Sequence, residues 1–184
     1  SGNIKSISII EKYETKLKNF TSVDVAVAGL YEEKKISTAD YYNYSVSTAR
    51  NLSSAKVKLG INLSRPISGT ISSRFGSISR VRSGAHTGLD IAASYGTKIK
   101  AAAAGTVIFS GWKGALGKMI AVYHGNGVMT YYGHCSSLYV SEGQKVSRGS
   151  VIAAVGSTGN STGNHLHLEV RVNGVAYNPQ NYVY

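Results

Sequence analysis

Histidine and acidic side chains gather in one short alternating segment near the end of this 184-residue sequence. The run from His165 to Val170 reads His-Leu-His-Leu-Glu-Val. In a β-strand, side chains two residues apart point to the same face, so His165, His167 and Glu169 would share a face. Two imidazoles placed in this way can converge on one metal ion.

A second pair of possible metal ligands lies earlier, at His86 and Asp90. Gly88 between them argues against a helix, and an extended chain also brings residues i and i+4 to the same side. Zinc accepts nitrogen and oxygen ligands, and a catalytic zinc site has three protein ligands and one open position. Either pair alone is more often an ordinary polar pair, but both pairs together favour a metal site.

The candidate donors outnumber the three ligands that a catalytic zinc requires. They are His86, Asp90, His134, His165, His167 and Glu169. The spacing leaves open which of His165, His167 and Glu169 would be the third ligand. Histidines that do not bind the metal could move protons and stabilise charge during hydrolysis.

The composition indicates a globular chain with one main core. The sequence is 42% hydrophobic and 9% aromatic, and no apolar run approaches the roughly 18 residues of a membrane span. The formal charge of +11 favours an acidic partner, but the basic residues are scattered and aromatic-rich nucleic-acid motifs are missing. We therefore expect no nucleic-acid partner and no membrane insertion. Cys135 is the single cysteine, which excludes an intramolecular disulfide.

The elements that must position these side chains change in character along the chain. We expect a strand or ribbon over residues 4–18, a short helix over 22–35 and a linker over 38–59. Beyond these, glycines separate short apolar segments, which is typical of all-β proteins. The predicted strands are Lys98–Ala102, Thr106–Ser110, Lys118–His124, Val128–His134, Val151–Val155 and His165–Val172. The prediction is a mainly β fold, an antiparallel sheet or sandwich, with a small N-terminal α+β extension.

Several ordered motifs resemble those of the lysostaphin-type or LytM-type zinc endopeptidases, peptidase family M23, which cleave the peptides of bacterial peptidoglycan. The matching motifs are Ser73-Arg74-Phe75-Gly76, His86-Thr87-Gly88-Leu89-Asp90, Gly105-Thr106-Val107, Tyr132-Gly133-His134, Gly143-Gln144-Lys145-Val146 and the run from Gly156 to Glu169. The resemblance covers about residues 64–184, which implies a peptidase domain there. Residues 1–63 would then be an extension or the remnant of a spacer or wall-associated module.

The resemblance implies that His86, Asp90 and His167 bind Zn²⁺ and that His134 and His165 are the catalytic imidazoles. It leaves open which of these two histidines is the general base. The metalloprotease helix motif His-Glu-x-x-His is absent, so histidine must do the work of a glutamate base. The implied substrate is peptidoglycan, in a stem peptide or a cross-bridge. The implied location is the cell wall or outside the bacterial cell, and we expect a monomer.

Other residues near these motifs have weaker assignments. Tyr132, Ser161 and Asn164 are candidates for contact with the substrate, although core packing or turn formation explains them equally well. His124 precedes a hairpin signal and is expected to pack or cap there rather than to bind metal. Glu169 is either an orienting carboxylate for a ligand or a plain surface carboxylate, and we favour the second interpretation.

Two functions of other classes fit parts of the sequence. A non-catalytic relative could use the same β scaffold to bind a partner, but the intact set of histidines argues against it. The spacing of Gly143, Val146 and Gly149 also resembles that of a carrier or barrel-sandwich module. Such a module would need a modifiable lysine on a hairpin tip and would not need the histidines.

Overall fold

The computed structural model describes residues 51–79 and 84–184. The strand expected over 4–18 and the helix expected over 22–35 lie outside the described residues, as does most of the linker expected over 38–59. The division into segments 1–63 and 64–184 therefore stays a prediction.

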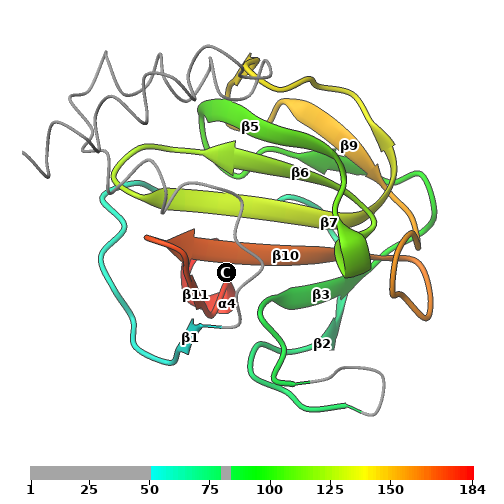
Figure 1. Ribbon diagram of the computed structural model, residues 1–184, viewed down its shortest axis with the longest axis horizontal. Coiled ribbons are helices and arrows are strands. Elements are labelled where there is room, and N and C mark those ends of the chain that lie inside the picture. Colours follow the sequence, from blue (N-terminus) through cyan, green and yellow to red (C-terminus); the bar gives the residue numbers. More distant parts are fainter. Residues whose placement is uncertain (1–50, 80–83) are drawn as a thin grey trace, which may run out of the picture.

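Within the described residues, the strands form one continuous hydrogen-bonded sheet. They are β1 (Leu52–Ser53), β2 (Thr70–Ser73), β3 (Leu89–Ala92), β4 (Lys98–Lys100), β5 (Gly105–Trp112), β6 (Lys118–Tyr123), β7 (Val128–Leu138), β8 (Lys145–Val146), β9 (Val151–Val155), β10 (His165–Val172) and β11 (Val175–Tyr177). The main path runs β1-β11-β10-β7-β6-β5-β8, and β2, β3, β4 and β9 pair outside it. Figure 1 shows β7 and β10 lying side by side at the centre.

Two short helical segments accompany the sheet in the described residues: a 3-10 turn, η1 (Gly114–Leu116), and the helix α4 (Gln180–Val183). Neither has the length and apolar character that a membrane crossing requires.

The prediction of a mainly β fold is confirmed, with one parallel pairing, β1 with β11, in an otherwise antiparallel sheet. Strands β9 and β10 have the predicted bounds. Strand β7 continues beyond its predicted end at His134 to Leu138. The strands that the sequence pattern did not predict, β1, β2, β3, β8 and β11, have only two to four residues, too few for an alternating pattern.

Strand β7 changes partners halfway along its length. From Val128 to Gly133 it pairs with β10, and from Cys135 to Leu138 it pairs with β9. His134 lies at the change and has a φ of 60°, the left-handed region that non-glycine residues rarely adopt. On the other side of β7, the register with β6 shifts at the same place, so β7 carries one extra residue there, a β-bulge.

The sheet buries apolar side chains on both faces. On one face, Leu166, Leu168 and Val170 of β10 join the larger core cluster and are fully buried. The other face carries a smaller cluster that includes Met129 and Tyr131 of β7. Full burial of a leucine or valine side chain contributes about 2 kcal/mol, so these rows hold β7 and β10 firmly together. The polar residues of β10 alternate with the apolar row and face the second cluster.

Candidate functional site

Asp90 and His167 are direct partners across the β3–β10 pair. Directly paired residues project their side chains to the same face, about 5 Å apart at Cβ. Asp90 Oδ1 accordingly lies 2.9 Å from His167 Nδ1. Both residues are buried, with exposed fractions of 8% and 5%.

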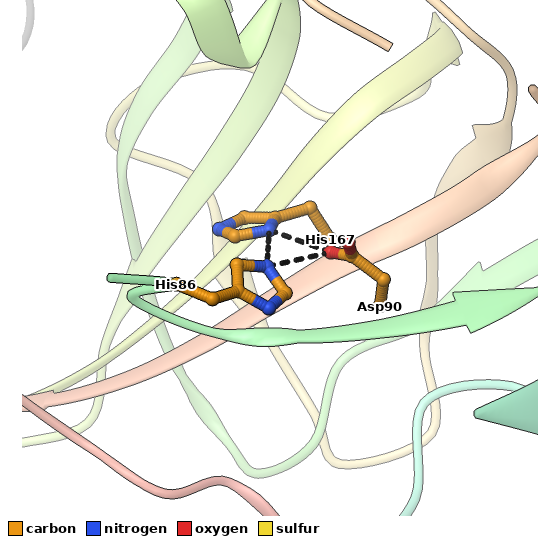
Figure 2. A group of neighbouring side chains, drawn as sticks. All are labelled: His86, Asp90 and His167. Atoms are coloured by element: carbon orange, nitrogen blue, oxygen red, sulfur yellow. Dashed lines mark hydrogen bonds and ion pairs between the residues drawn. The ribbon is translucent and has the colours of Figure 1, made fainter. Parts of the chain in front are cut away.

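His86 reaches the same point from the loop that precedes β3. Its Nε2 lies 2.9 Å from Asp90 Oδ1 and 3.0 Å from His167 Nδ1. Gly88 allows this approach, because a Cβ there would stand 2.4 Å from the carbonyl oxygen of Leu168. Figure 2 shows the three side chains converging from β3, β10 and the loop.

In both His86 and His167, the outer ring nitrogen, which points away from the other two side chains, is also hydrogen-bonded. His86 Nδ1 lies 3.0 Å from the carbonyl oxygen of Arg74, and His167 Nε2 lies 3.0 Å from Glu169 Oε1. A carbonyl or a carboxylate oxygen accepts hydrogen bonds, so both outer nitrogens carry a proton and donate it. The lone pairs available for a metal are therefore on His86 Nε2 and His167 Nδ1. This is the arrangement expected of histidines that bind metal.

Glu169 is fully buried behind His167 rather than on the surface. Its carboxylate accepts hydrogen bonds from Thr87 Oγ1 and Arg171 Nε as well as from His167. Arg171 is equally buried and also donates to the carbonyl oxygen of Gly174. The interpretation of Glu169 as a surface carboxylate is thus wrong, and its geometry is that of an orienting group.

The charges of the cluster shift the pKa values of its members. Burial works against protonation of His167, but hydrogen bonds to Asp90 and Glu169 outweigh it and raise the pKa of His167 to about 9. For Asp90, burial alone would raise the pKa. The hydrogen bonds from His167 and His86 prevail, and the pKa of Asp90 falls well below its usual range. Asp90 is therefore a carboxylate at any pH near neutrality.

The donor set fits a zinc ion. A tetrahedral zinc with ligand bonds of about 2.0 to 2.1 Å separates its ligand atoms by about 3.3 Å. The three atoms here are 2.9 to 3.0 Å apart, so an outward shift of a few tenths of an ångström would accommodate the ion. Two nitrogens and one carboxylate oxygen, each aimed at the same point, are also ligands that zinc accepts.

His134 and His165 lie beside this cluster. Their ring centroids are 4.7 Å apart, the rings of His134 and His167 are 5.7 Å apart, and His165 Nε2 lies 3.7 Å from Asp90 Oδ1. His134 Nδ1 donates to the carbonyl oxygen of Thr158 and His165 Nδ1 to that of Gly163, each at 2.8 Å. In the neutral ring, Nε2 is therefore the proton acceptor in both.

His134 is neutral near pH 7. Burial first, and then the neighbouring His167, lower the pKa of His134 to about 4. A neutral imidazole with an unprotonated Nε2 can accept a proton from water.

The structure does not bring Tyr132 to the site. This side chain is fully buried, and its hydroxyl accepts hydrogen bonds from the Ala102 amide and Thr130. The bulge is the physical reason: Tyr132 faces the core with Leu168, while the extra residue turns His134 to the opposite face. The expectation that Tyr132 contacts substrate is corrected accordingly.

Ser161, Asn164 and His124 have different positions. Ser161 is half-buried and lies 3.3 Å from His165 Nδ1, whereas Asn164 is exposed next to His165. The role of these two residues in substrate binding stays a prediction. His124 is hydrogen-bonded to the carbonyl oxygen of Ala104 and to Thr130, so it packs at the strand end as expected.

Sequence reasoning missed the groups that anchor the histidines. The carbonyl oxygens of Arg74, Thr158 and Gly163 belong to the backbone, and no residue type indicates them in advance. Glu169 did carry a signal, because the alternation placed it on the face of His167. Its burial depends on Arg171, whose place on the same face continues that alternation.

Known proteins resemble the part of the chain that contains this site. The sequence model of Peptidase family M23 matches residues 84–179. A DD-carboxypeptidase/endopeptidase, Mpg, of Neisseria meningitidis is 50% identical over 94 residues, 51% of this chain and 22% of that protein. The chain therefore aligns with less than a quarter of this relative's length.

The fold is shared with solved structures of other proteins, two of which illustrate the likeness. The catalytic domain of lysostaphin, an antimicrobial peptidase from Staphylococcus simulans, is 30% identical with a TM-score of 0.58, over 61% of this chain and 90% of that one. A zinc-containing peptidase from Vibrio cholerae is 30% identical with a TM-score of 0.60, over 64% of this chain and 39% of that one.

Proposed function

Because this chain belongs to peptidase family M23, we propose that it is a zinc-dependent endopeptidase that hydrolyses peptide bonds in bacterial peptidoglycan. The observation that carries the proposal is the buried triangle of His86 Nε2, Asp90 Oδ1 and His167 Nδ1, with His134 and His165 beside it. Residues 64–184 would form the peptidase domain. The similarity to the Neisseria carboxypeptidase/endopeptidase and to lysostaphin supports peptidase activity. The similarity to the zinc-containing Vibrio peptidase supports zinc as the metal.

In this proposal, His86, Asp90 and His167 hold the zinc ion. A zinc ion bound there lowers the pKa of water and polarises a carbonyl oxygen. The chain's own contribution is to keep three donor atoms aimed at one point. The Arg74 carbonyl and the Glu169 carboxylate do this by holding the outer nitrogens of His86 and His167.

His134 and His165 move the protons of the hydrolysis. Each has Nδ1–H fixed on a backbone carbonyl and Nε2 as its proton acceptor. One imidazole takes a proton from the attacking water. The other donates a hydrogen bond to the oxyanion or a proton to the leaving amine. Both steps need an imidazole that stays in one orientation, which the two backbone carbonyls provide.

The substrate in this proposal is anionic and lies outside the cytoplasm, in the bacterial cell wall. The formal charge of +11 supports an anionic polymer, because a positively charged surface raises the local concentration of such a substrate. The scissile bond lies in a stem peptide or a cross-bridge. We propose that the chain acts as a monomer.

Digestion of purified peptidoglycan tests the proposal. New amino termini, identified by mass spectrometry, should appear with the zinc-loaded chain, disappear after chelation and return when zinc is restored. Asp90→Asn removes the ligand charge, and this variant should lose both the zinc and the activity. Glu142→Gln is a matched control, because it makes the same chemical change at a carboxylate that binds the Ser110 amide instead. A zinc-loaded chain that binds peptidoglycan yet releases no new termini would contradict the proposal and favour a non-catalytic relative.

A further inference from the structure

We propose that Thr158 is a positioning residue that locks the β7 bulge and fixes the tautomer of His134, an inference that rests on the proposed function. Thr158 lies in the loop between β9 and β10, residues 156–164. Its hydroxyl contacts the strands that flank the bulge, and its carbonyl contacts the bulged residue His134.

The hydroxyl of Thr158 joins the two strands that flank the bulge. Its Oγ1 accepts a hydrogen bond from the Lys118 amide at 3.0 Å and donates one to the carbonyl oxygen of Cys135 at 2.8 Å. Lys118 and Cys135 are the paired residues at which the shifted β6–β7 register resumes. One hydroxyl thus bridges β6 and β7 next to the extra residue.

The carbonyl oxygen of the same residue holds the His134 ring. It accepts the Nδ1 hydrogen bond at 2.8 Å, so the position of the loop determines which nitrogen of His134 is protonated. The backbone of His134 is in the left-handed region, with a φ of 60°. A histidine in that conformation is strained, so its surroundings must hold it there.

Close backbone packing fixes the loop against η1. The Asn160 amide donates to the carbonyl oxygen of Ala115 at 2.8 Å. A Cβ on Gly117 would stand 2.4 Å from the carbonyl carbon of Thr158. A Cβ on Gly114, in the same turn, would meet nothing within 4 Å. Both glycines have a positive φ, so they form a matched pair that differs in contact with Thr158.

Two variants of Thr158 test the hydroxyl while the backbone carbonyl stays in place. Thr158→Val keeps the shape and the carbonyl but removes the hydroxyl. We expect kcat on purified muropeptide dimers to fall about tenfold, with KM and bound zinc unchanged, because the loop that carries the Thr158 carbonyl is no longer tied to β6 and β7 and no longer holds the His134 ring in one position. Thr158→Ser keeps the hydroxyl and should retain kcat within about twofold. A Val variant with wild-type kcat, or an equal loss in the Ser variant, overturns the proposal.

Long-range ¹H–¹⁵N NMR of the histidine rings reads the tautomer directly. At neutral pH, wild-type His134 should be protonated at Nδ1 and unprotonated at Nε2, and the Val variant should show a mixture. The opposite tautomer in the wild type overturns the proposal even if no variant folds. Gly117→Ala should disturb the His134 signals and Gly114→Ala should leave them unchanged. Equal behaviour of the two alanine variants also overturns it.

The NMR readout distinguishes this inference from the proposed function. If the wild-type chain cleaves no peptidoglycan, the proposed function fails, while the tautomer still tests the role of Thr158. If the wild-type chain is active and the tautomer is the opposite one, the role of Thr158 and the assignment of His134 Nε2 as proton acceptor fail, while the peptidoglycan hydrolysis itself stands.

Discussion

Glu169 Oε1 lies 3.0 Å from His167 Nε2, across the imidazole ring from the nitrogen that faces Asp90. The ring is therefore held between two carboxylates, one across the strand pair on β3 and one further along β10. Because Glu169 also binds Arg171 and Thr87, its carboxylate has little freedom to turn away. The rigidity of the proposed zinc ligand thus depends on a residue that does not touch the metal.

Replacing Glu169 by glutamine tests this dependence. Glu169→Gln preserves the shape but removes the charge that fixes the His167 ring and faces Arg171. We expect zinc affinity to fall about 10- to 100-fold, measured by competition with a chromogenic chelator. Because Arg171 loses its carboxylate partner, the free energy of unfolding should fall by about 3 kcal/mol. Glu142→Gln serves as control, and equal zinc affinities in the two variants would exclude an orienting role for Glu169.

Zinc affinity should depend on pH through His167. In the metal-free protein the pKa of His167 is raised to about 9, so Nδ1 carries a proton below that pH. Zinc needs this lone pair, and each bound ion must displace the proton. The apparent affinity should therefore fall about tenfold per pH unit between about pH 9 and pH 7. A pH-independent affinity over this range, measured with a buffered chelator, would contradict the assignment of Nδ1 as ligand atom.

The same proton affects the stability of the metal-free protein. The folded pKa of His167 lies above the ordinary value of 6.5, so its contribution to stability is fully present below that pH. The contribution is lost as the pH rises through about 9. Chemical denaturation of the chelated protein should show this loss. The zinc-loaded protein, in which the proton is absent, should not show it.

His134→Ala should separate catalysis from metal binding. His134 is beside the triangle but contributes none of its three atoms, so the variant should retain about one zinc per chain. Loss of an imidazole that transfers protons should reduce peptide hydrolysis about 10²- to 10⁴-fold. His124→Gln is the control. It removes a partly buried histidine that contacts Thr130 instead of the triangle, and this variant should remain active. Full hydrolysis by His134→Ala would remove this residue from the mechanism.

Cys135 should be inert in the folded chain. It is fully buried, and burial raises the pKa of its thiol from about 9 to about 12. The thiolate is the reactive form, so reaction with a disulfide reagent at pH 8 should be roughly a thousandfold slower than in the unfolded chain. Comparing rates in buffer and in denaturant measures this. Rapid labelling of the native protein would show that the β7 bulge opens readily.

The sequence predicted the parts of this protein that follow a regular period. Flanking glycines marked the apolar run of β9. Alternation placed His165, His167 and Glu169 of β10 on one face, as the contacts of Asp90 and Arg171 confirm. Strands β2 and β3 were not predicted, because their four residues carry no clear alternation.

The β7 bulge could not be predicted from the periodic pattern of the sequence. An unbroken strand would put Tyr132 and His134 on the same face. One inserted residue reverses this, and within the run Tyr-Tyr-Gly-His-Cys only Gly133 hints at it, because a glycine inside a strand often accompanies a bulge. The bulge is determined by contacts from far along the chain, such as the Thr158 hydroxyl, which no local pattern contains.

The change of partner along β7 divides the site between two halves of the sheet. The three atoms of the triangle belong to the half built on β3 and β10, while His134 is held by the loop that leaves β9. Strand β7 runs through both halves, so the bend at its bulge sets the spacing between His134 and the three atoms of the triangle. A change of the backbone at residue 134 would therefore move His134 relative to the triangle while leaving the contacts within the triangle unchanged.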